Sequence, residues 1–317
     1  MTSLIGVSWD FLTPGNRERI LYNPQGYPVR FLSVPPTKEE MEACDILFGM
    51  FPPKLLKEAK KLKWLQTPCA GVEQFAHKEL YAGPITLTNA AGAYGTAISE
   101  HLLTLTLMLF RRMGEYYEQQ QKQQWGLVGQ VRPVFGAVTT VVGLGDIGSA
   151  YAKKMNALGA IVRGVRRHTG EKPDYLDQLY SSQDLDQALE GADIVALCLP
   201  GTKNTVNILS AERIRRLKKG CIVLNIGRGS AIDQDALIQG LNNGSLGGAG
   251  LDVMTPEPLP KGHPLWSAQN LILTPHVSGQ NSMELTLDRI VTLFLENLAH
   301  YAAGEPFEHE VDWELGY

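Results

Sequence analysis

The chain lacks two features that would indicate whole classes of protein: a long apolar segment and a large net charge. Its longest apolar run, Leu102–Phe110, is far shorter than the ~20 residues of a membrane-spanning helix and contains threonines. The formal net charge is only -4 over 317 residues, so electrostatics favours neither nucleic acid nor an anionic membrane as a partner. The first residues lack a basic stretch followed by an apolar core, and we therefore expect no export signal.

Cysteine is also scarce, and none of the four cysteines is placed for a metal site or a redox pair. Cys44, Cys69, Cys198 and Cys221 show no C-x-x-C spacing, and the last two lie in apolar, strand-like runs where buried thiols are common. A catalytic thiol at Cys69 is the weaker alternative to a structural one. We therefore expect no metal centre and a reducing, cytoplasmic setting.

Glycine is abundant, and three glycines form the most informative motif of the chain. Residues 139–148 read TTVVGLGDIG, in which Gly143, Gly145 and Gly148 fit G-x-G-x-x-G after a β-branched run. A helical pattern follows as far as Gly159, and then a second apolar run at residues 160–162. This strand, turn, helix and strand form the context in which such glycines bind a dinucleotide, whose phosphates meet the helix N-terminus. The alternative is a glycine turn that serves packing alone.

The segments on either side of this motif predict two α/β domains. Before it, apolar runs alternate with amphipathic segments, which is typical of a parallel sheet covered on both faces. The strands expected there are Leu4–Val7, Val29–Val34, Ile46–Gly49, Leu62–Gln66 and Ile85–Thr88, with helices at Lys38–Ala43 and Pro53–Lys61. Between the domains we expect a buried helix, Ser99–Arg112, and a polar helix or arm, Glu115–Gln124.

After the glycine motif the alternation continues. Strands are expected at Ile194–Leu199, Ile222–Asn225, Gly247–Val253 and Leu271–Thr274, with one helix from Ser210 to Lys219 and another from Asp233 to Leu241. The basic residues near Lys219 suit the end of a helix better than a nucleic-acid site. A final long helix, Glu284–Ala303, would return the chain to the first domain.

Three polar residues follow predicted strand ends in the second half of the chain. Arg228 follows the strand at Asn225, Glu257 follows the strand at Val253, and His276 follows the strand at Thr274. Ligands of open α/β sheets sit outside the carboxyl ends of the strands, so these side chains are expected at one edge. Arginine can grip a carboxylate, histidine can pass a proton near neutral pH, and a carboxylate can fix its tautomer. Taken singly, His276 and Glu257 could be structural or exposed. Arg228 lies between two glycines, which we expect to clear space around it.

The chain resembles the D-isomer-specific 2-hydroxyacid dehydrogenases over nearly its whole length. The matching stretches occur in the order and spacing of that family. They are VVGLGDIG at 141–148, CLPGTKNTVNIL at 198–209, LNIGRGSAID at 224–233, GLDVMTPEPLP at 250–260, HPLW at 263–266 and TPHVSG at 274–279, with AGVE at 70–73 and SEH at 99–101 also similar.

The resemblance implies a fold and a set of roles. It implies two Rossmann-like or flavodoxin-like parallel-sheet α/β domains with the active site in the cleft between them: residues 1–97 with 283–317 for the substrate, and residues 98–282 for the dinucleotide. Arg228 would bind the substrate, with the backbone at Ala70 and Gly71 holding its carboxylate. His276 would be the acid and base, and Glu257 its partner. The cofactor would contact Gly143, Gly145, Asp146, Ile147, Gly148, Leu199, Pro200, Thr205, Ile226, Gly227, Asp252 and Gly279.

One departure from the family bears on the cofactor. Members that prefer NAD carry an acidic residue at the end of the second strand of the glycine-motif domain, where it accepts bonds from the ribose 2′-OH. Residues 161–168 read IVRGVRRH and contain no acid, and Arg166 stands 18 residues after Gly148. Arg166 and Arg167 can bind the 2′-phosphate of NADP, so we expect NADP(H) to be preferred and NAD(H) to be possible. The alternative is a pair of surface charges on a loop.

Two hypotheses for function follow. The first is an NAD(P)-dependent oxidoreductase that reduces a small 2-keto acid, of the glyoxylate or hydroxypyruvate type, to the D-2-hydroxy acid. The second is a nucleotide-sensing binding protein or corepressor on the same fold. The long helix from Ser99 and the arm through Trp125 resemble the dimer-forming segment of the family, and we expect a homodimer. The specificity of the substrate pocket is expected to involve Met50, Phe51 and residues near Trp266.

Overall fold

The computed structural model describes residues 3–280 and 283–316 and divides the chain into two compact units. The first unit comprises Met1–Tyr94 and Gln280–Tyr317, and the second comprises Gly95–Gly279. In the described part of the chain, every helix is too short or too polar to cross a membrane.

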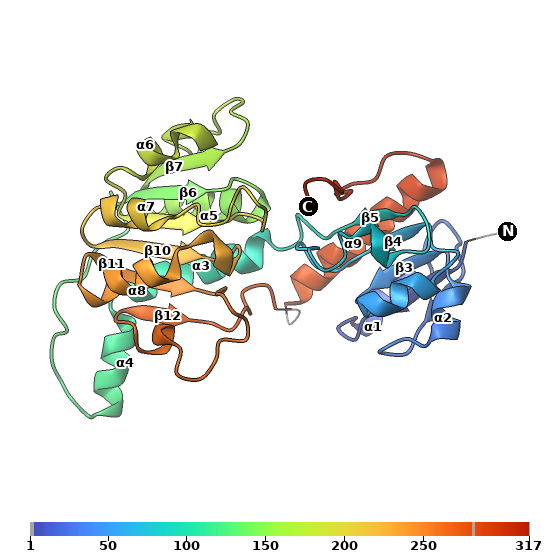
Figure 1. The fold of residues 1–317 in the computed structure, drawn as a ribbon, viewed down its shortest axis with the longest axis horizontal. Helices are drawn as coiled ribbons and strands as arrows, with labels where there is room; N and C mark the ends of the chain where they lie inside the picture. Colours follow the sequence, from blue (N-terminus) through green and yellow to red (C-terminus); the bar gives the residue numbers. More distant parts are fainter. Residues whose placement is uncertain (1–2, 281–282, 317) are drawn as a thin grey trace. The chain divides into compact units, whose positions relative to one another are not determined.

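The first unit is built on a five-stranded parallel sheet with the strand order β2-β1-β3-β4-β5 (Figure 1). This is the flavodoxin-like order, in which successive connections cover both faces of the sheet. The strands are β1 (Ile5–Ser8), β2 (Val29–Phe31), β3 (Ile46–Gly49), β4 (Trp64–Gln66) and β5 (Thr86–Thr88).

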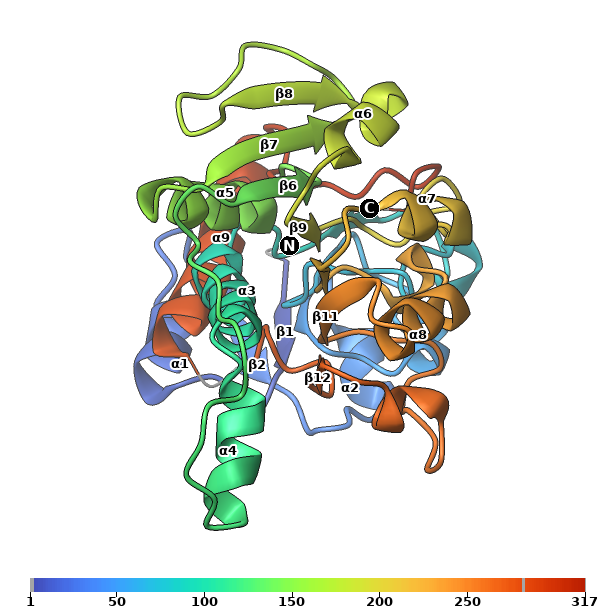
Figure 2. The same ribbon diagram turned by 90° about the vertical axis from the view of Figure 1, so that its left-hand side faces the viewer.

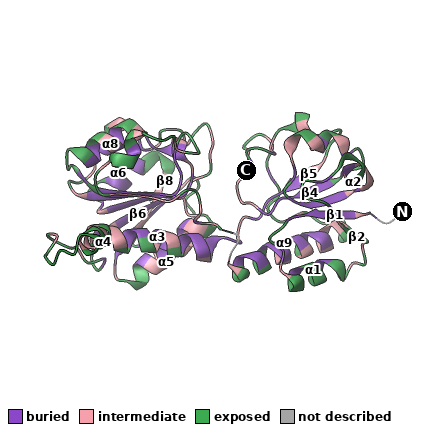
Figure 3. Cartoon of the chain, turned by 90° about the horizontal axis from the view of Figure 1, so that it is seen from below, coloured by how far each residue is buried: buried purple, intermediate pink, exposed green. Residues whose placement is uncertain are grey.

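Helices from both ends of the chain cover one face of this sheet (Figure 3). Helix α1 (Pro14–Leu21) begins where the Thr13 hydroxyl accepts the Asn16 N–H, and it packs beside α9 (Glu284–Ala303). From α9, Phe294 stacks on Phe48 and Trp64 of the sheet. The opposite face is covered by α2 (Lys38–Ala43) and the 3₁₀ turns η1 (Pro53–Glu58) and η2 (Lys78–Leu80).

The second unit is built on a seven-stranded parallel sheet with the order β12-β11-β10-β9-β6-β7-β8. Counted from β6, this is the Rossmann order with one strand added beside the sixth. The strands are β6 (Val138–Val142), β7 (Ile161–Arg166), β8 (Gln178–Ser181), β9 (Ile194–Leu197), β10 (Cys221–Asn225), β11 (Leu246–Leu251) and β12 (Leu271–Leu273). The order reverses between β6 and β9, which is where such sheets bind their ligands.

Two layers of helices cover the sheet of the second unit (Figure 3). On one face α3 (Gly95–Phe110) packs along α5 (Asp146–Ala157), and a buried hydrogen bond of 2.7 Å joins Thr106 of α3 to Tyr151 of α5. The other face carries α6 (Leu185–Leu189), α7 (Ala211–Arg216) and α8 (Gln234–Asn242). Two further 3₁₀ turns, η4 (Gly229–Ala231) and η5 (Pro264–Ser267), follow β10 and β11, and η3 (Ser182–Asp184) precedes α6.

Some local expectations were wrong. The helix expected over Pro53–Lys61 is the 3₁₀ turn η1, and the helix capped by Ser210 ends at Arg216, because Leu217 is already extended. The polar segment after α3 forms α4 (Met113–Gln121), which projects from the second unit (Figure 2). The elements α1, β8 and α6 were not predicted from the sequence.

Candidate active site

The glycine motif forms the turn between β6 and α5, and its first and third glycines are needed for packing. Gly143 has φ +99°, and a Cβ there would collide with the carbonyl oxygen of Cys198 after β9. A Cβ on Gly148 would collide with the carbonyl oxygen of Gly143. These two glycines therefore let the turn close and let neighbouring strand ends approach at the point where the strand order reverses.

Gly145, the second glycine, lies in a different environment. A Cβ there would meet no atom within 4 Å, so the fold itself does not require glycine. Gly145 is the N-cap of α5 and has no side chain to bond the first N–H groups of the helix. The open approach and the uncapped helix N-terminus fit a pyrophosphate, which needs close backbone contact and N–H donors. Asp146 and Ile147 begin the helix, and the Asp146 carboxylate lies against Gly95 of α3.

The loop after β9 packs tightly against the loop after β10. A Cβ on Gly227 would collide with the carbonyl oxygen of Leu199. The Thr205 hydroxyl donates to the carbonyl of Pro200 at 2.8 Å, which closes the β9 loop. Ile226 is buried beside it. Leu199, Pro200, Thr205, Ile226 and Gly227 are therefore gathered at one edge of the sheet, beside the glycine turn.

Arg228 is held by its backbone. The Asn225 side chain donates to the Arg228 carbonyl at 2.9 Å and accepts the Gly227 N–H at 3.0 Å. The guanidinium donates to the Gly227 carbonyl at 2.7 Å. We expected the two flanking glycines to clear space around Arg228, and this was wrong, since a Cβ on Gly229 would collide with the backbone of Met254. They are small because two other loops press against this one.

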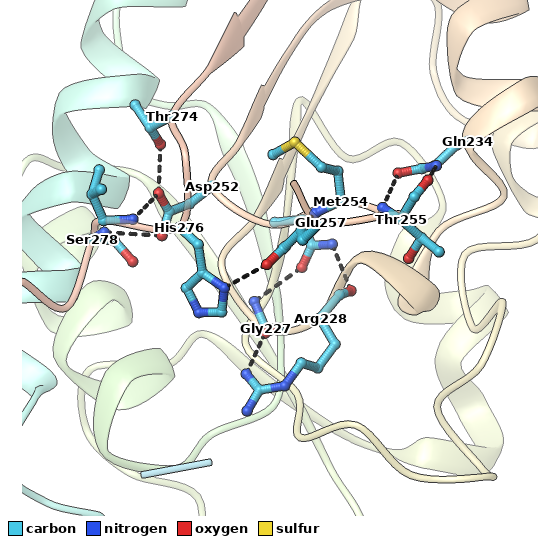
Figure 4. Close-up of polar contacts among 12 residues, drawn as sticks. Gly227, Arg228, Gln234, Asp252, Met254, Thr255, Glu257, Thr274, His276 and Ser278 are labelled. Carbon is cyan, nitrogen blue, oxygen red and sulfur yellow. Dashed lines mark hydrogen bonds and ion pairs between the residues drawn. The ribbon is translucent and has the colours of Figure 1, made fainter. Parts of the chain in front are cut away.

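His276 and Glu257 form a hydrogen-bonded pair (Figure 4). His276 Nδ1 lies 2.8 Å from one Glu257 carboxylate oxygen, and the other oxygen accepts the Met254 N–H at 2.8 Å. An ionised carboxylate only accepts hydrogen bonds, so Nδ1 carries the proton of the neutral ring. Nε2 is then the nitrogen that can exchange a proton, and the side chain is 51% exposed. The pair has the geometry that a general acid and its orienting carboxylate require.

Asp252 is fully buried beneath the segment that carries His276. Its carboxylate accepts the Thr274 hydroxyl at 2.6 Å and the N–H groups of Val277 and Ser278 at 2.8 and 2.9 Å. Burial acts to raise the pKa of Asp252, but the hydrogen bonds from Ser278, Thr274 and the backbone outweigh it and lower the pKa. Asp252 is therefore an anion that orders residues 274–278. Gly279, next in the chain, ends the second unit.

Arg166 is the last residue of β7, and its guanidinium is only partly engaged. Nη2 donates to the Glu171 carbonyl at 3.0 Å, which folds the following loop back toward the strand end. The Nε of Arg166 is buried and has no hydrogen-bond partner among the described residues. Arg167 follows on the exposed surface. The structure thus places two arginines together at the end of the second strand of this sheet.

In the first unit, Ala70 and Gly71 lie in the loop after β4. Two hydrogen bonds hold the start of this loop: the Tyr94 hydroxyl donates to the Pro68 carbonyl at 2.5 Å, and the Ala90 N–H donates to the Cys69 carbonyl at 2.9 Å. Within residues 3–280 and 283–316, the N–H groups of Ala70 and Gly71 have no protein acceptor. Adjacent N–H groups of this kind can bind an anion.

Sequence reasoning missed several polar residues that hold these loops. Asn225 ties the Arg228 turn, Thr274 bonds Asp252, and Gln234 makes a pair of hydrogen bonds with the backbone of Thr255 before Glu257 (Figure 4). Asn225 could have been found, because a polar residue ends an otherwise apolar strand. The other two depend on contacts between distant segments, which one sequence does not reveal.

The sheet order, the glycine turn and the His–Glu pair define a nicotinamide-dependent dehydrogenase. Residues 103–278 match the D-isomer specific 2-hydroxyacid dehydrogenase, NAD binding domain. The chain belongs to this family and is an NAD(P)-dependent oxidoreductase of 2-hydroxy acids.

Individual relatives extend the match over both units. The chain is 33% identical to a glyoxylate/hydroxypyruvate reductase B from Cronobacter sakazakii, over 70% of each chain. A D-isomer specific 2-hydroxyacid dehydrogenase family protein from Aeromonas salmonicida has a similar structure, with TM-score 0.86 and 30% identity over 98% of this chain and 99% of that one. The NADPH-dependent glyoxylate/hydroxypyruvate reductase of Sinorhizobium meliloti, in complex with NADP and sulfate, gives TM-score 0.85 and 25% identity over the whole of both chains.

Proposed function

We propose that this enzyme reduces a small 2-keto acid of the glyoxylate or hydroxypyruvate type, with NADPH as the preferred reductant. The observation that carries the proposal is the His276–Glu257 pair, whose geometry leaves Nε2 of an oriented ring to take up a proton and pass it to the substrate. The substrate class is supported by the relatives from Cronobacter sakazakii and Sinorhizobium meliloti, which are named for glyoxylate and hydroxypyruvate.

Each residue has a distinct part in this mechanism. The reduced nicotinamide, when bound, supplies a hydride to the keto carbon. His276, with both ring nitrogens protonated, donates the Nε2 proton to the oxygen that becomes the alcohol, and Glu257 stabilises the imidazolium through Nδ1. Arg228 binds the substrate carboxylate and stabilises negative charge on the carbonyl oxygen. The adjacent N–H groups of Ala70 and Gly71 are suited to bind a carboxylate. Asp252 holds the His276 segment in place and lies toward the nicotinamide end of the cofactor site.

A kinetic screen tests the function directly. We expect the enzyme to reduce glyoxylate or hydroxypyruvate with a kcat in the usual range of roughly 1–10³ per second. The reaction is monitored by the loss of NADPH absorbance at about 340 nm. Pyruvate and larger 2-keto acids provide the comparison. Tight NADPH binding without turnover of any 2-keto acid would overturn the proposal and favour a nucleotide-sensing protein.

The preference for NADPH rests on Arg166 and Arg167. A guanidinium can bind a phosphate through two charge-assisted hydrogen bonds, and both arginines stand where an acidic residue would otherwise select NAD. The buried Nε of Arg166 is a donor without a partner, which a 2′-phosphate could satisfy. No acid in residues 161–168 would repel that phosphate.

Changing Arg166 to aspartate should therefore reverse the cofactor preference. We expect kcat/KM with NADPH to fall by about 100-fold, since a charge-assisted bidentate contact is lost and a repulsion is added. The value with NADH should change by less than about threefold. Arg163→Ala is the matched control, because that side chain bonds the carbonyls of Ala188 and Glu190 instead. Equal losses with both cofactors would contradict the assignment, as would a parent enzyme that favours NADH.

We propose that the enzyme is a homodimer, formed through α4 and the arm that follows it. This segment leaves large apolar side chains in solvent: Trp125 is fully exposed, Leu127 is 91% exposed and Phe135 is 78% exposed. Exposed apolar side chains of this size, grouped on one segment, are typical of an interface. A second copy of the chain would cover them about a two-fold axis.

The cysteine pattern leads us to place the enzyme in a reducing compartment, the cytoplasm.

Light scattering should give a mass of two chains of 34.8 kDa each. The double variant Trp125→Ser, Leu127→Ser should shift the mass toward one chain, because it removes the apolar anchors of the arm. Tyr22→Ser is the control, since Tyr22 is 73% exposed but lies in the first unit. A parent protein that runs as a single chain at working concentration would rule the dimer out.

A further inference from the structure

A second histidine makes polar contacts with the segment that carries His276. His101, on α3, places Nε2 3.0 Å from the Thr274 hydroxyl and 4.0 Å from the nearer carboxylate oxygen of Asp252. The Thr274 hydroxyl in turn lies 2.6 Å from that same oxygen. Three side chains from α3, the end of β11 and the end of β12 therefore form one continuous network.

The direction of each hydrogen bond in this network follows from Asp252. The hydrogen bonds around Asp252 lower its pKa, so it is ionised and can only accept. Thr274 must therefore donate its single proton to Asp252, and its oxygen is left to accept from His101. His101 consequently carries a proton on Nε2. A leucine at residue 101 would leave the Thr274 oxygen without this donor in a partly buried place.

The network ends on the backbone that sets the position of His276. Asp252 accepts the N–H groups of Val277 and Ser278, and the Asp252 carbonyl accepts the His276 N–H at 2.8 Å. His276 itself has φ +53°, a left-handed conformation that residues other than glycine adopt only when their surroundings enforce it. The hydrogen bonds to Asp252, together with the one from the His276 N–H to the Thr274 carbonyl at 3.0 Å, hold the backbone in this conformation.

We propose that His101 is a positioning residue for the proton transfer. It donates to Thr274, orients the Thr274 hydroxyl toward Asp252, and so fixes the carboxylate that holds residues 276–278. The imidazole of His276 is thereby kept in reach of Glu257. The proposal rests on the proposed role of His276 as the proton donor, but its effect on the order of residues 276–278 does not.

Two variants separate the hydrogen bond of His101 from its bulk. His101→Leu keeps a similar volume and loses the donor, whereas His101→Gln keeps an N–H near the place of Nε2. We expect kcat for 2-keto acid reduction to fall about tenfold or more in the leucine variant, because misplacing a catalytic group by a fraction of an ångström is costly. The KM for NADPH should change by less than about twofold. The glutamine variant should recover most of the loss, within about threefold of the parent. Thr104→Ala, an exposed change on α3, is the control.

Hydrogen exchange provides a readout that does not depend on turnover. In the leucine variant, amide exchange at Val277 and Ser278 should speed up about tenfold or more. Exchange in β6 and β9 should stay at the rate of the parent protein. The glutamine variant should return the exchange of Val277 and Ser278 to near the parent rate. The proposal would be overturned if the leucine variant of an active enzyme kept the exchange rates of the parent at these amides, or kept the kcat of the parent. Equal losses of kcat in the leucine and glutamine variants would also overturn it. Faster exchange in a protein that reduces no 2-keto acid would instead overturn the proposed function and retain the positioning network.

Discussion

Replacing His276 by alanine should lower kcat for 2-keto acid reduction by about 10²–10⁴-fold, the usual contribution of a positioned general acid. The imidazole is the group whose Nε2 remains available once Glu257 holds Nδ1. The binding of NADPH should be almost unchanged, because the side chain is half exposed and its loss should not disturb the glycine turn. The comparison is made by steady-state kinetics together with fluorescence titration of NADPH.

Two further variants make this result specific. Glu257→Gln should give a smaller loss, since the amide oxygen can still accept from Nδ1, although the amide carries no charge to stabilise the protonated ring and its NH2 group cannot accept the Met254 N–H. His77→Ala, an exposed histidine of the first unit, should behave as the parent. If the alanine variant of His276 reduces 2-keto acids as fast as the parent, another group is the proton donor.

Replacing Gly145 by valine should abolish most of the NADPH affinity and leave the fold intact. The backbone at Gly145 has φ -75° and ψ -161°, which valine adopts easily, and a Cβ there meets no protein atom within 4 Å. The isopropyl group would instead occupy the space into which the pyrophosphate must come. We expect Kd for NADPH to rise by at least about 100-fold, with a melting temperature within a few degrees of the parent.

The same substitution at Gly148, in the same motif, should instead destabilise the fold. A Cβ there would overlap the carbonyl oxygen of Gly143 and stand 3.3 Å from Cys198, so Gly148→Val must move backbone. Overpacking of this kind costs about 1–3 kcal/mol or more, and the melting temperature should fall clearly. The two roles are misassigned if Gly145→Val unfolds like Gly148→Val or binds NADPH like the parent.

The strands of both sheets were largely predictable because buried parallel strands are short, apolar and rich in β-branched residues. β3 has the predicted bounds, as does the helix α9. By contrast, β8 is an edge strand with one exposed and three half-buried residues, so its sequence carries little apolar signal. Helix α1 buries only Asn16 and Ile20, although Thr13 followed by Pro14 is a readable start signal. Edge strands and solvent-exposed helices are therefore the elements that the hydrophobic pattern of a sequence predicts least well.

For the candidate site, the sequence indicated which residues would be gathered but not how they are held. Arg228, Glu257 and His276 were predicted at strand ends, and parallel strands bring their ends to one edge. The bond between Glu257 and His276 depends on the course of two loops, and the left-handed conformation of His276 on the hydrogen bonds around Asp252. The reason offered for the glycines beside Arg228 was wrong, because a sequence shows neighbours along the chain and not the loops that press from elsewhere.

Those glycines have a consequence for engineering. Gly227 and Gly229 are pressed against the backbones of Leu199 and Met254, so the loops after three neighbouring strands behave as one interlocked piece. Randomising this piece to alter substrate preference would mainly yield proteins that no longer fold. Libraries should instead be aimed at accessible side chains for which the sequence predicts a part in specificity, such as Met50 and Trp266, where volume can change without displacing backbone. We therefore expect the residues of this piece to tolerate mutation less well than the exposed residues outside it.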